Sequence, residues 1–133
     1  MIGRALILGS VALLASVASC STPPIVGDWV RKAPACADEQ QDRLTIDADM
    51  TGTATLLYSC HGPGGTAVMC AANLRIAESF EGDGRWKLEA NVGYCEAAGA
   101  ELGRLFEECQ PLSDDEYFCC DPSGKSCFDI VRA

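Results

Sequence analysis

Hydrophobic and polar residues alternate along most of the chain after residue 24, and turn-forming residues separate the alternating runs. Alternation with period two puts every second side chain on one face, which is typical of strands that bury a single face. The runs that we expect to be strands are 25–30, 43–46, 53–58, 74–80, 86–94, 116–120 and 127–131. Consecutive antiparallel strands joined by short turns pair with their neighbours. The pattern therefore predicts a mainly β fold, a small antiparallel meander closed as a barrel or packed as a sandwich.

The strand expected at 86–94 has the clearest alternation. Its charged and amide residues Lys87, Glu89 and Asn91 share one face, and its large apolar residues share the other. If this strand lines a hollow barrel, the residues that would face a ligand are Trp86, Leu88, Val92 and Tyr94. A small barrel can also be filled by its own side chains. The pattern leaves both possibilities open.

One stretch departs from the strand pattern. Between residues 97 and 109 the apolar residues fall at helical spacing, at positions Leu102, Leu105, Phe106 and Cys109. Pro111 follows, as is common after a helix end. Gly99 and Gly103 oppose a helix, because each costs about 1 kcal/mol in a helix interior. We expect a short helix or an irregular cap at 97–109.

The N-terminal segment has the features of an export signal. Arg4 precedes an apolar run at 5–17, which is short for a membrane span of about 20 residues. The run ends in Val17-Ala18-Ser19-Cys20, which resembles the lipobox of bacterial lipoproteins. The resemblance implies cleavage before Cys20 and lipidation of its thiol. Ser21 is not the aspartate that retains many such proteins at the inner membrane, which favours the outer membrane.

This resemblance divides the chain into three parts. Residues 1–19 would be the signal peptide, 20–26 the lipidated cysteine and a tether containing Pro23 and Pro24, and 27–133 a single disulfide-rich β domain. The chain would then reside in the bacterial cell envelope, attached to a membrane by its lipid. The alternative is an ordinary secretory signal peptide, with Cys20 as one more disulfide cysteine.

Cysteine parity favours lipidation. Of the 9 cysteines, removal of Cys20 leaves an even number that can pair completely: Cys36, Cys60, Cys70, Cys95, Cys109, Cys119, Cys120 and Cys127. No C-x-x-C pair is present, which opposes a redox site or a zinc ribbon, so we expect structural disulfides. Cys119 and Cys120 would point to opposite faces of a strand, with Cys127 a partner for one of them. The full connectivity stays open among about 105 possibilities.

The first predicted strand opens with Gly27-Asp28-Trp29, which resembles the G-x-W element of lipocalins and small lipocalin-like bacterial domains. In that family the tryptophan closes one end of an antiparallel barrel, and an arginine from a late strand packs on its ring. The resemblance implies that Trp29 and Arg132 form this barrel-closing pair through a cation–π contact. The same pattern recurs at Gly84-Arg85-Trp86, and Trp29 can also be read as an ordinary core tryptophan.

The residues that could carry chemistry form no recognisable catalytic or metal-binding set. His61 is the only histidine and lies in a Gly/Pro loop, and no G-x-S-x-G motif accompanies it. Asp47, Asp49 and Thr51 fall at positions 1, 3 and 5 of an EF-hand loop, but position 12 is Tyr58. We therefore expect no cofactor, no metal and no enzymatic activity, and a hydrolase is disfavoured.

Charge narrows the class of partner. The formal net charge of −9 opposes binding to nucleic acid, which needs clustered Lys and Arg. We expect a lipid-anchored, non-enzymatic binding protein that takes a small apolar ligand or a protein partner. The alternative is a protease inhibitor on a disulfide-stapled scaffold, with the 60–70 loop as its reactive segment.

Overall fold

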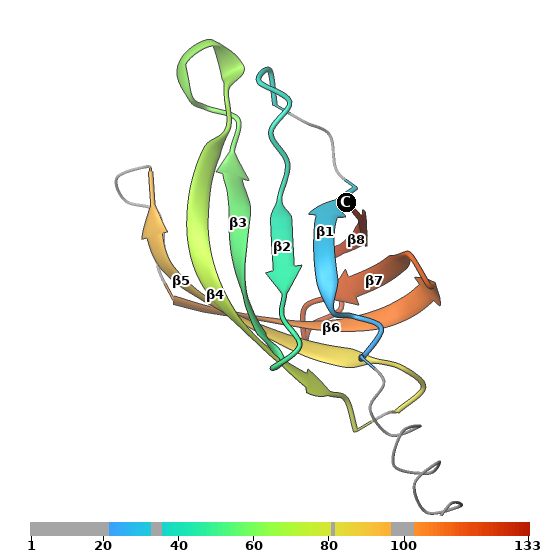
Figure 1. The fold of residues 1–133 in the computed structure, drawn as a ribbon. Helices are drawn as coiled ribbons and strands as arrows, with labels where there is room; N and C mark the ends of the chain where they lie inside the picture. The colour runs from blue at the N-terminus through green and yellow to red at the C-terminus, as the bar shows by residue number, and fades with distance from the viewer. Residues whose placement is uncertain (1–21, 33–35, 81, 97–102) are drawn as a thin grey trace, which may run out of the picture.

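The computed structural model describes residues 22–32, 36–80, 82–96 and 103–133. Eight antiparallel strands follow one another in chain order and close into a barrel (Figure 1). The strands are β1 (Gly27–Arg31), β2 (Arg43–Ile46), β3 (Thr51–Ser59), β4 (Val68–Glu78), β5 (Trp86–Cys95), β6 (Gly103–Ser113), β7 (Glu116–Cys120) and β8 (Cys127–Arg132). The expected antiparallel meander is confirmed, in its barrel form.

Residues 103–109 correct the prediction of a helix. They belong to β6, which pairs with β5 so that Cys109 lies opposite Trp86 and Leu105 opposite Ala90. Strand β5 has buried residues along its length and requires a partner on this side, and Gly103 weakens the competing helix. Residues 97–102, the rest of the predicted helix, lie outside the described residues. In the part of the chain that the structure describes, the helical element is the short 3₁₀ turn Pro63–Gly65.

The fourth predicted strand also needs a correction. Strand β4 begins earlier than expected, at Val68, and ends at Glu78. Leu74 and Ile76 point into the core as predicted, whereas Phe80 lies in the following turn and is 99% exposed. Phe80 is therefore not part of the buried face.

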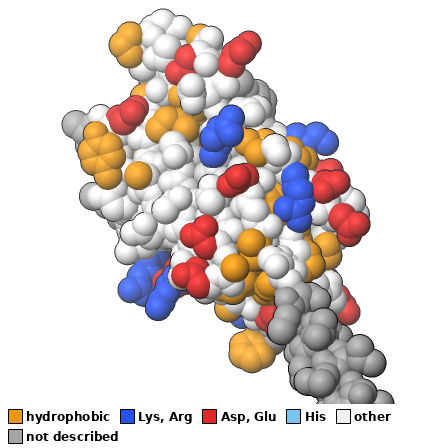
Figure 2. Space-filling model, in the orientation of Figure 1, with side chains coloured by type: hydrophobic (Ala, Val, Ile, Leu, Met, Phe, Trp, Pro, Cys, Tyr) orange, Lys and Arg blue, Asp and Glu red, His pale blue; other side chains and the backbone are white. Residues whose placement is uncertain are grey.

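The barrel interior is packed with apolar side chains. Those with almost no exposed surface are Ile25, Trp29, Ile46, Cys109, Cys119 and Ile130. Those that lie in strands have half-buried or exposed neighbours on either side, as an interior face requires. Basic and acidic side chains are interspersed over the surface of the face that Figure 2 shows.

Meander topology gives the barrel two distinct ends. The turns after β2, β4 and β6 lie at one end, together with the segment before β1, and Ile25 of this segment is completely buried. We call this the closed end. The connections after β1, β3, β5 and β7 lie at the other end, which we call the loop end.

Four disulfides use the eight cysteines beyond Cys20, in the pairs Cys36–Cys60, Cys70–Cys95, Cys109–Cys119 and Cys120–Cys127. The last three join residues directly opposite each other on neighbouring strands. As expected, Cys119 and Cys120 point to opposite faces: Cys119 is completely buried with Cys109, and Cys120 bonds the half-buried Cys127. Cys20, the predicted lipidation site, lies outside the described residues.

Candidate functional site

Trp29 and Arg132 lie together at the closed end. Strand β1 pairs with β8 so that the two residues are directly opposite, and the Arg132 guanidinium carbon is 4.4 Å from the centroid of the Trp29 ring. The Trp29 indole N–H donates to the Ile25 carbonyl at 2.8 Å, and its ring meets Tyr117 edge-on with centroids 5.2 Å apart. Arg132 donates to the carbonyls of Pro24 and Val26 at 2.6 and 3.2 Å. This arrangement fastens the segment before β1 across the barrel end.

Gly27 makes room for this arrangement. Its φ is +137°, and a Cβ there would lie 2.7 Å from the Arg132 Nη1. A residue with a side chain would therefore meet both backbone strain and a clash with the guanidinium group. The requirement for glycine at the first position of the G-x-W element has a physical basis here.

Three of the four predicted ligand-facing residues point into the barrel. Trp86, Leu88 and Val92 are 7%, 4% and 6% exposed and belong to the packed core. Their partners in that core include Leu74 and Ile76 from β4. These three side chains fill the barrel interior, because they pack against other side chains of the barrel.

Tyr94 was wrongly assigned to this face. The β4–β5 register pairs Ala72 with Val92 and Ala71 with Tyr94, so β5 holds one extra residue, Gly93. An inserted residue of this kind, a β-bulge, reverses which face the following side chains take. Tyr94 consequently lies on the outer surface with 62% of its area exposed.

A groove of about 890 Å³ runs along β4–β7. Most residues that line it occupy exposed or half-buried positions that alternate with the core, such as Arg75, Lys87, Phe106 and Glu108. Phe106 is 50% exposed, and Phe118 lines the groove from β7. The groove thus offers apolar surface on the outside of the barrel.

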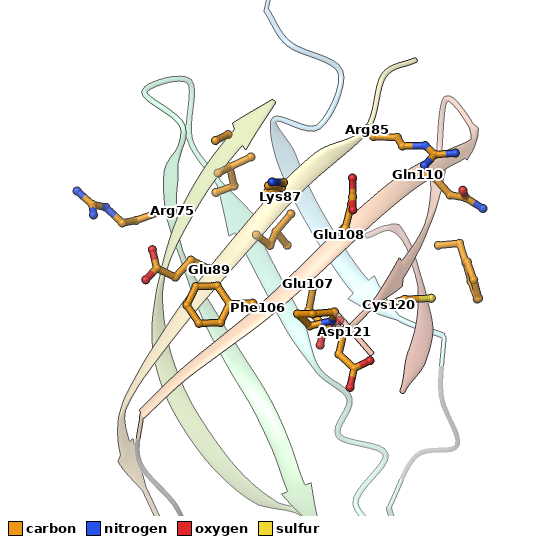
Figure 3. A pocket seen from close by; sticks show the side chains of 15 residues that line it. Arg75, Arg85, Lys87, Glu89, Phe106, Glu107, Glu108, Gln110, Cys120 and Asp121 are labelled. Atoms are coloured by element: carbon orange, nitrogen blue, oxygen red, sulfur yellow. The ribbon is translucent and has the colours of Figure 1, made fainter. Parts of the chain in front are cut away.

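The two sides of the groove differ in charge. Arg75 and Lys87 extend from β4 and β5, whereas Glu108 and Asp121 come from β6 and the end of β7 (Figure 3). The Lys87 ammonium lies 5.0 Å from the centre of the Phe80 ring, and Glu108 accepts a hydrogen bond from the Ser79 hydroxyl. An amphipathic partner with charges of both signs would complement this surface.

Glu107 lies beside Asp121 at the acidic side (Figure 3). Burial, reinforced by the nearby Asp121 carboxylate and opposed by Arg31, raises the pKa of Glu107 to about 7. One Glu107 carboxylate oxygen is buried and has no hydrogen-bond partner among the described residues.

A second hollow, of about 450 Å³, continues the outer surface toward β3. It shares Arg75 and Glu89 with the groove and adds Asn73, Asn91 and Arg104. Arg104 forms an ion pair with Glu89, with 3.6 Å between Nε and Oε1. The outer face of β3–β6 is therefore mainly polar beyond the groove.

The 60–70 loop is fastened at both ends by different disulfides, Cys36–Cys60 and Cys70–Cys95. Within it, Gly62 and Thr66 close a tight turn, since the Gly62 N–H donates to the Thr66 carbonyl at 3.0 Å. The Asp38 carboxylate also accepts from the Ala67 N–H at 3.2 Å. His61 is exposed in this loop, away from the residues that line the groove.

Residues 47–50 form the turn between β2 and β3. Asp49 accepts hydrogen bonds from the Thr51 hydroxyl and the Thr51 N–H, at 2.6 and 3.0 Å, and these bonds lower its pKa. The Asp49 carboxylate thus stabilises a tight turn. Among the described residues, no group of three or more His, Cys, Asp or Glu is placed to hold a metal ion.

The groove residues were missed by the sequence reasoning. Arg104, Phe106 and Glu108 alternate with Leu105, Glu107 and Cys109, and this alternation was present in the sequence. Because both faces of β6 carry apolar residues, the spacing of these residues also matched that of an amphipathic helix. The charged residues Arg104 and Glu108, on the same strand face as Phe106, were the available signal.

Comparison with protein-family models, curated proteins and solved structures found no match to this chain. No helix within the described ranges is both long and apolar enough to cross a membrane.

Proposed function

We propose that this chain is a lipid-anchored protein of the bacterial cell envelope that binds a protein partner without catalysis. Cys20 would carry the lipid, most simply at the outer membrane, and the barrel would present the β4–β7 groove to the partner. The observation that carries the proposal is this groove of about 890 Å³, with Phe106 half exposed in its lining. Exposed aromatic surface rimmed by charge is typical of protein interaction sites.

The packing of the interior favours a protein partner over a small apolar ligand. The side chains expected to face such a ligand, Trp86, Leu88 and Val92, are buried in the barrel core by neighbouring side chains. A ligand in their place would have to displace packed apolar groups, each contributing about 1.5–3 kcal/mol when buried. The groove needs no such rearrangement.

A protease inhibitor is the second candidate, because disulfides fasten both ends of the exposed 60–70 loop. A substrate-like inhibitor loop lies extended in the protease cleft, whereas Pro63–Gly65 forms a short 3₁₀ turn. Full activity of a panel of secreted proteases in the presence of the protein would reject this candidate.

The partner can be sought by affinity capture on the immobilised protein from envelope extracts of its own host. Phe106→Ser should remove the partner, because it takes an exposed aromatic out of the groove. Leu112→Ser is the matched control: Leu112 is on the same strand, is 55% exposed and does not line the groove. A partner that both variants retain, or that both lose, would contradict the groove as the binding surface.

A further inference from the structure

Strand β6 has a backbone edge that no other strand of the described residues covers. It pairs with β5 from Gly103 to Cys109, but its pairing with β7 begins only at Glu108. Beyond Cys120 the chain turns away through Asp121, so residues 103–107 have a strand on one side only. Figure 1 shows β5 and β6 extending together away from β7 and β8.

The register identifies which backbone groups face the free edge. Cys109 and Cys119 lie opposite each other with their Cα atoms 4.0 Å apart, the short spacing of a non-hydrogen-bonded antiparallel pair. The groups that point toward β7 therefore belong to Glu108 and Gln110. By the alternation of the strand, those of Phe106 and Arg104 point the same way, beyond the end of β7. Within the described residues, no hydrogen bond to these N–H and C=O groups is recorded.

The groove and the free edge meet. Phe106, Glu107, Asp121 and Pro122 line the groove where β7 ends. We propose that an extended polypeptide segment adds to β6 here as an antiparallel strand, taking the position that β7 leaves at Cys120. This inference rests on the proposed function, because it specifies how the groove would take its protein partner.

The surrounding side chains define the chemistry of that segment. Leu105, on the inner face of β6, is 50% exposed and would contact an apolar residue of the added strand. Glu107 and Asp121 place two neighbouring carboxyl groups at one end of the free edge. The partner segment should therefore alternate, with an apolar residue opposite Leu105 and a lysine or arginine near Glu107. The overall charge of −9 also favours a basic segment.

The test uses the full chain and a fluorescein-labelled nine-residue peptide of alternating valine and threonine with a central lysine. We expect saturable anisotropy below about 1 mM, together with slower hydrogen exchange at the Arg104 and Phe106 amides. Methylation of alternate peptide nitrogens should weaken binding about tenfold or more, since each methyl group removes one backbone hydrogen-bond donor. Replacing the peptide lysine by glutamate should also weaken binding.

Arg104→Pro tests the same edge from the side of the protein. Proline removes an N–H that faces the free edge and leaves the ladder to β5 intact, so the barrel should fold and lose the peptide. Arg104→Ala, which loses the same side chain, should still bind. If Arg104→Pro misfolds, the methylated peptide on the unaltered protein decides the question.

Three results would overturn the inference: no binding at about 1 mM, equal binding of the methylated peptide, or self-association that protects the same amides. The last result would make a second copy of the chain the occupant. These outcomes are distinct from failure of the proposed function. If a captured partner no longer bound Phe106→Ser but still bound Arg104→Pro, the groove would be supported as the binding surface and strand addition would be rejected.

Discussion

Glu107 lies directly opposite Leu88 in the β5–β6 register, so a carboxyl group shares the inner face of the sheet with a core leucine. Leu88 is 4% exposed, and Glu107 is half buried. Burial raises the pKa of Glu107 to about 7. Its ionised form is disfavoured in the folded protein because water cannot fully solvate it there.

The stability of the barrel should therefore decrease as the pH rises through the window set by Glu107. The ordinary pKa is 4.5, so between about pH 4.5 and 7 the folded state binds more protons than the unfolded state. Glu107→Gln should change the free energy of unfolding little near pH 4. Near pH 8 it should stabilise the protein by about 1 kcal/mol, a value reduced for the partial exposure of the group. Urea unfolding at the two pH values measures the difference.

Glu78→Gln is the control for this measurement, because it removes the same charge from an exposed position. It should alter stability by similar, small amounts at both pH values. A Glu107→Gln effect that is independent of pH would show that the gain comes from packing.

The Arg132 guanidinium makes four contacts at the closed end, with the Trp29 ring, the carbonyls of Pro24 and Val26, and the Asp115 carboxylate. Arg132→Met should lower the free energy of unfolding by about 1–3 kcal/mol, because the carbonyls lose their donors and the ring loses its cation. The free energy of unfolding of Arg132→Lys should lie between those of the unaltered protein and Arg132→Met. An ammonium group keeps the positive charge but cannot reproduce the planar set of donors of a guanidinium group. Urea denaturation reports these differences.

Asp115→Asn separates the contribution of the ion pair. The Asp115 side chain is 78% exposed, and such pairs contribute about 0–1 kcal/mol. If Asp115→Asn lowered the free energy of unfolding as much as Arg132→Met does, the stabilisation would come from the ion pair and not from the closure of the barrel end.

The strands that the sequence predicted best are those whose alternation is uninterrupted. The bounds of β2 and β7 are the expected ones, since their buried residues simply alternate with more exposed ones. Strand β6 was mistaken because Leu105 and Cys109 face inward while Phe106 faces the groove, and apolar residues on both faces imitate a helical stripe. Tertiary pairing with β5 decided between these alternatives, and a local pattern does not contain that information.

Register accounts for the other misses. The bulge at Gly93 moved Tyr94 to the outside, and a glycine within a strand pattern was its only local sign. The Cys70–Cys95 bond depends on the same shifted register, so its partners could not be read from spacing. The free edge of β6 arises because β7 ends at Cys120, opposite Glu108, and this is a property of two strands together.

Gly52 provides a test of backbone packing in the barrel. A Cβ at this position would lie 1.9 Å from the Thr45 carbonyl oxygen, a backbone atom that cannot move aside cheaply. Gly52→Ala should destabilise the barrel by about 3 kcal/mol, at the upper end of the cost of overpacking. Gly93→Ala is the control, because nothing lies within 4 Å of its Cβ, and it should be neutral or slightly stabilising. Equal losses in both variants would contradict the strand register at Gly52.

Cys20→Ser tests the proposed anchor against the disulfide set. The four bonds use Cys36 with Cys60, Cys70 with Cys95, Cys109 with Cys119 and Cys120 with Cys127, which leaves Cys20 outside every pair. The variant should therefore lose fatty-acid labelling and cleavage before residue 20, while its barrel folds with no free thiol. Metabolic labelling and alkylation followed by mass spectrometry give the two readings. Retained labelling would reject Cys20 as the lipid site, and a newly free thiol elsewhere would mean that Cys20 exchanges into the disulfide set. Since each bond typically contributes about 2–4 kcal/mol, such an exchange would also appear as a clear loss of stability.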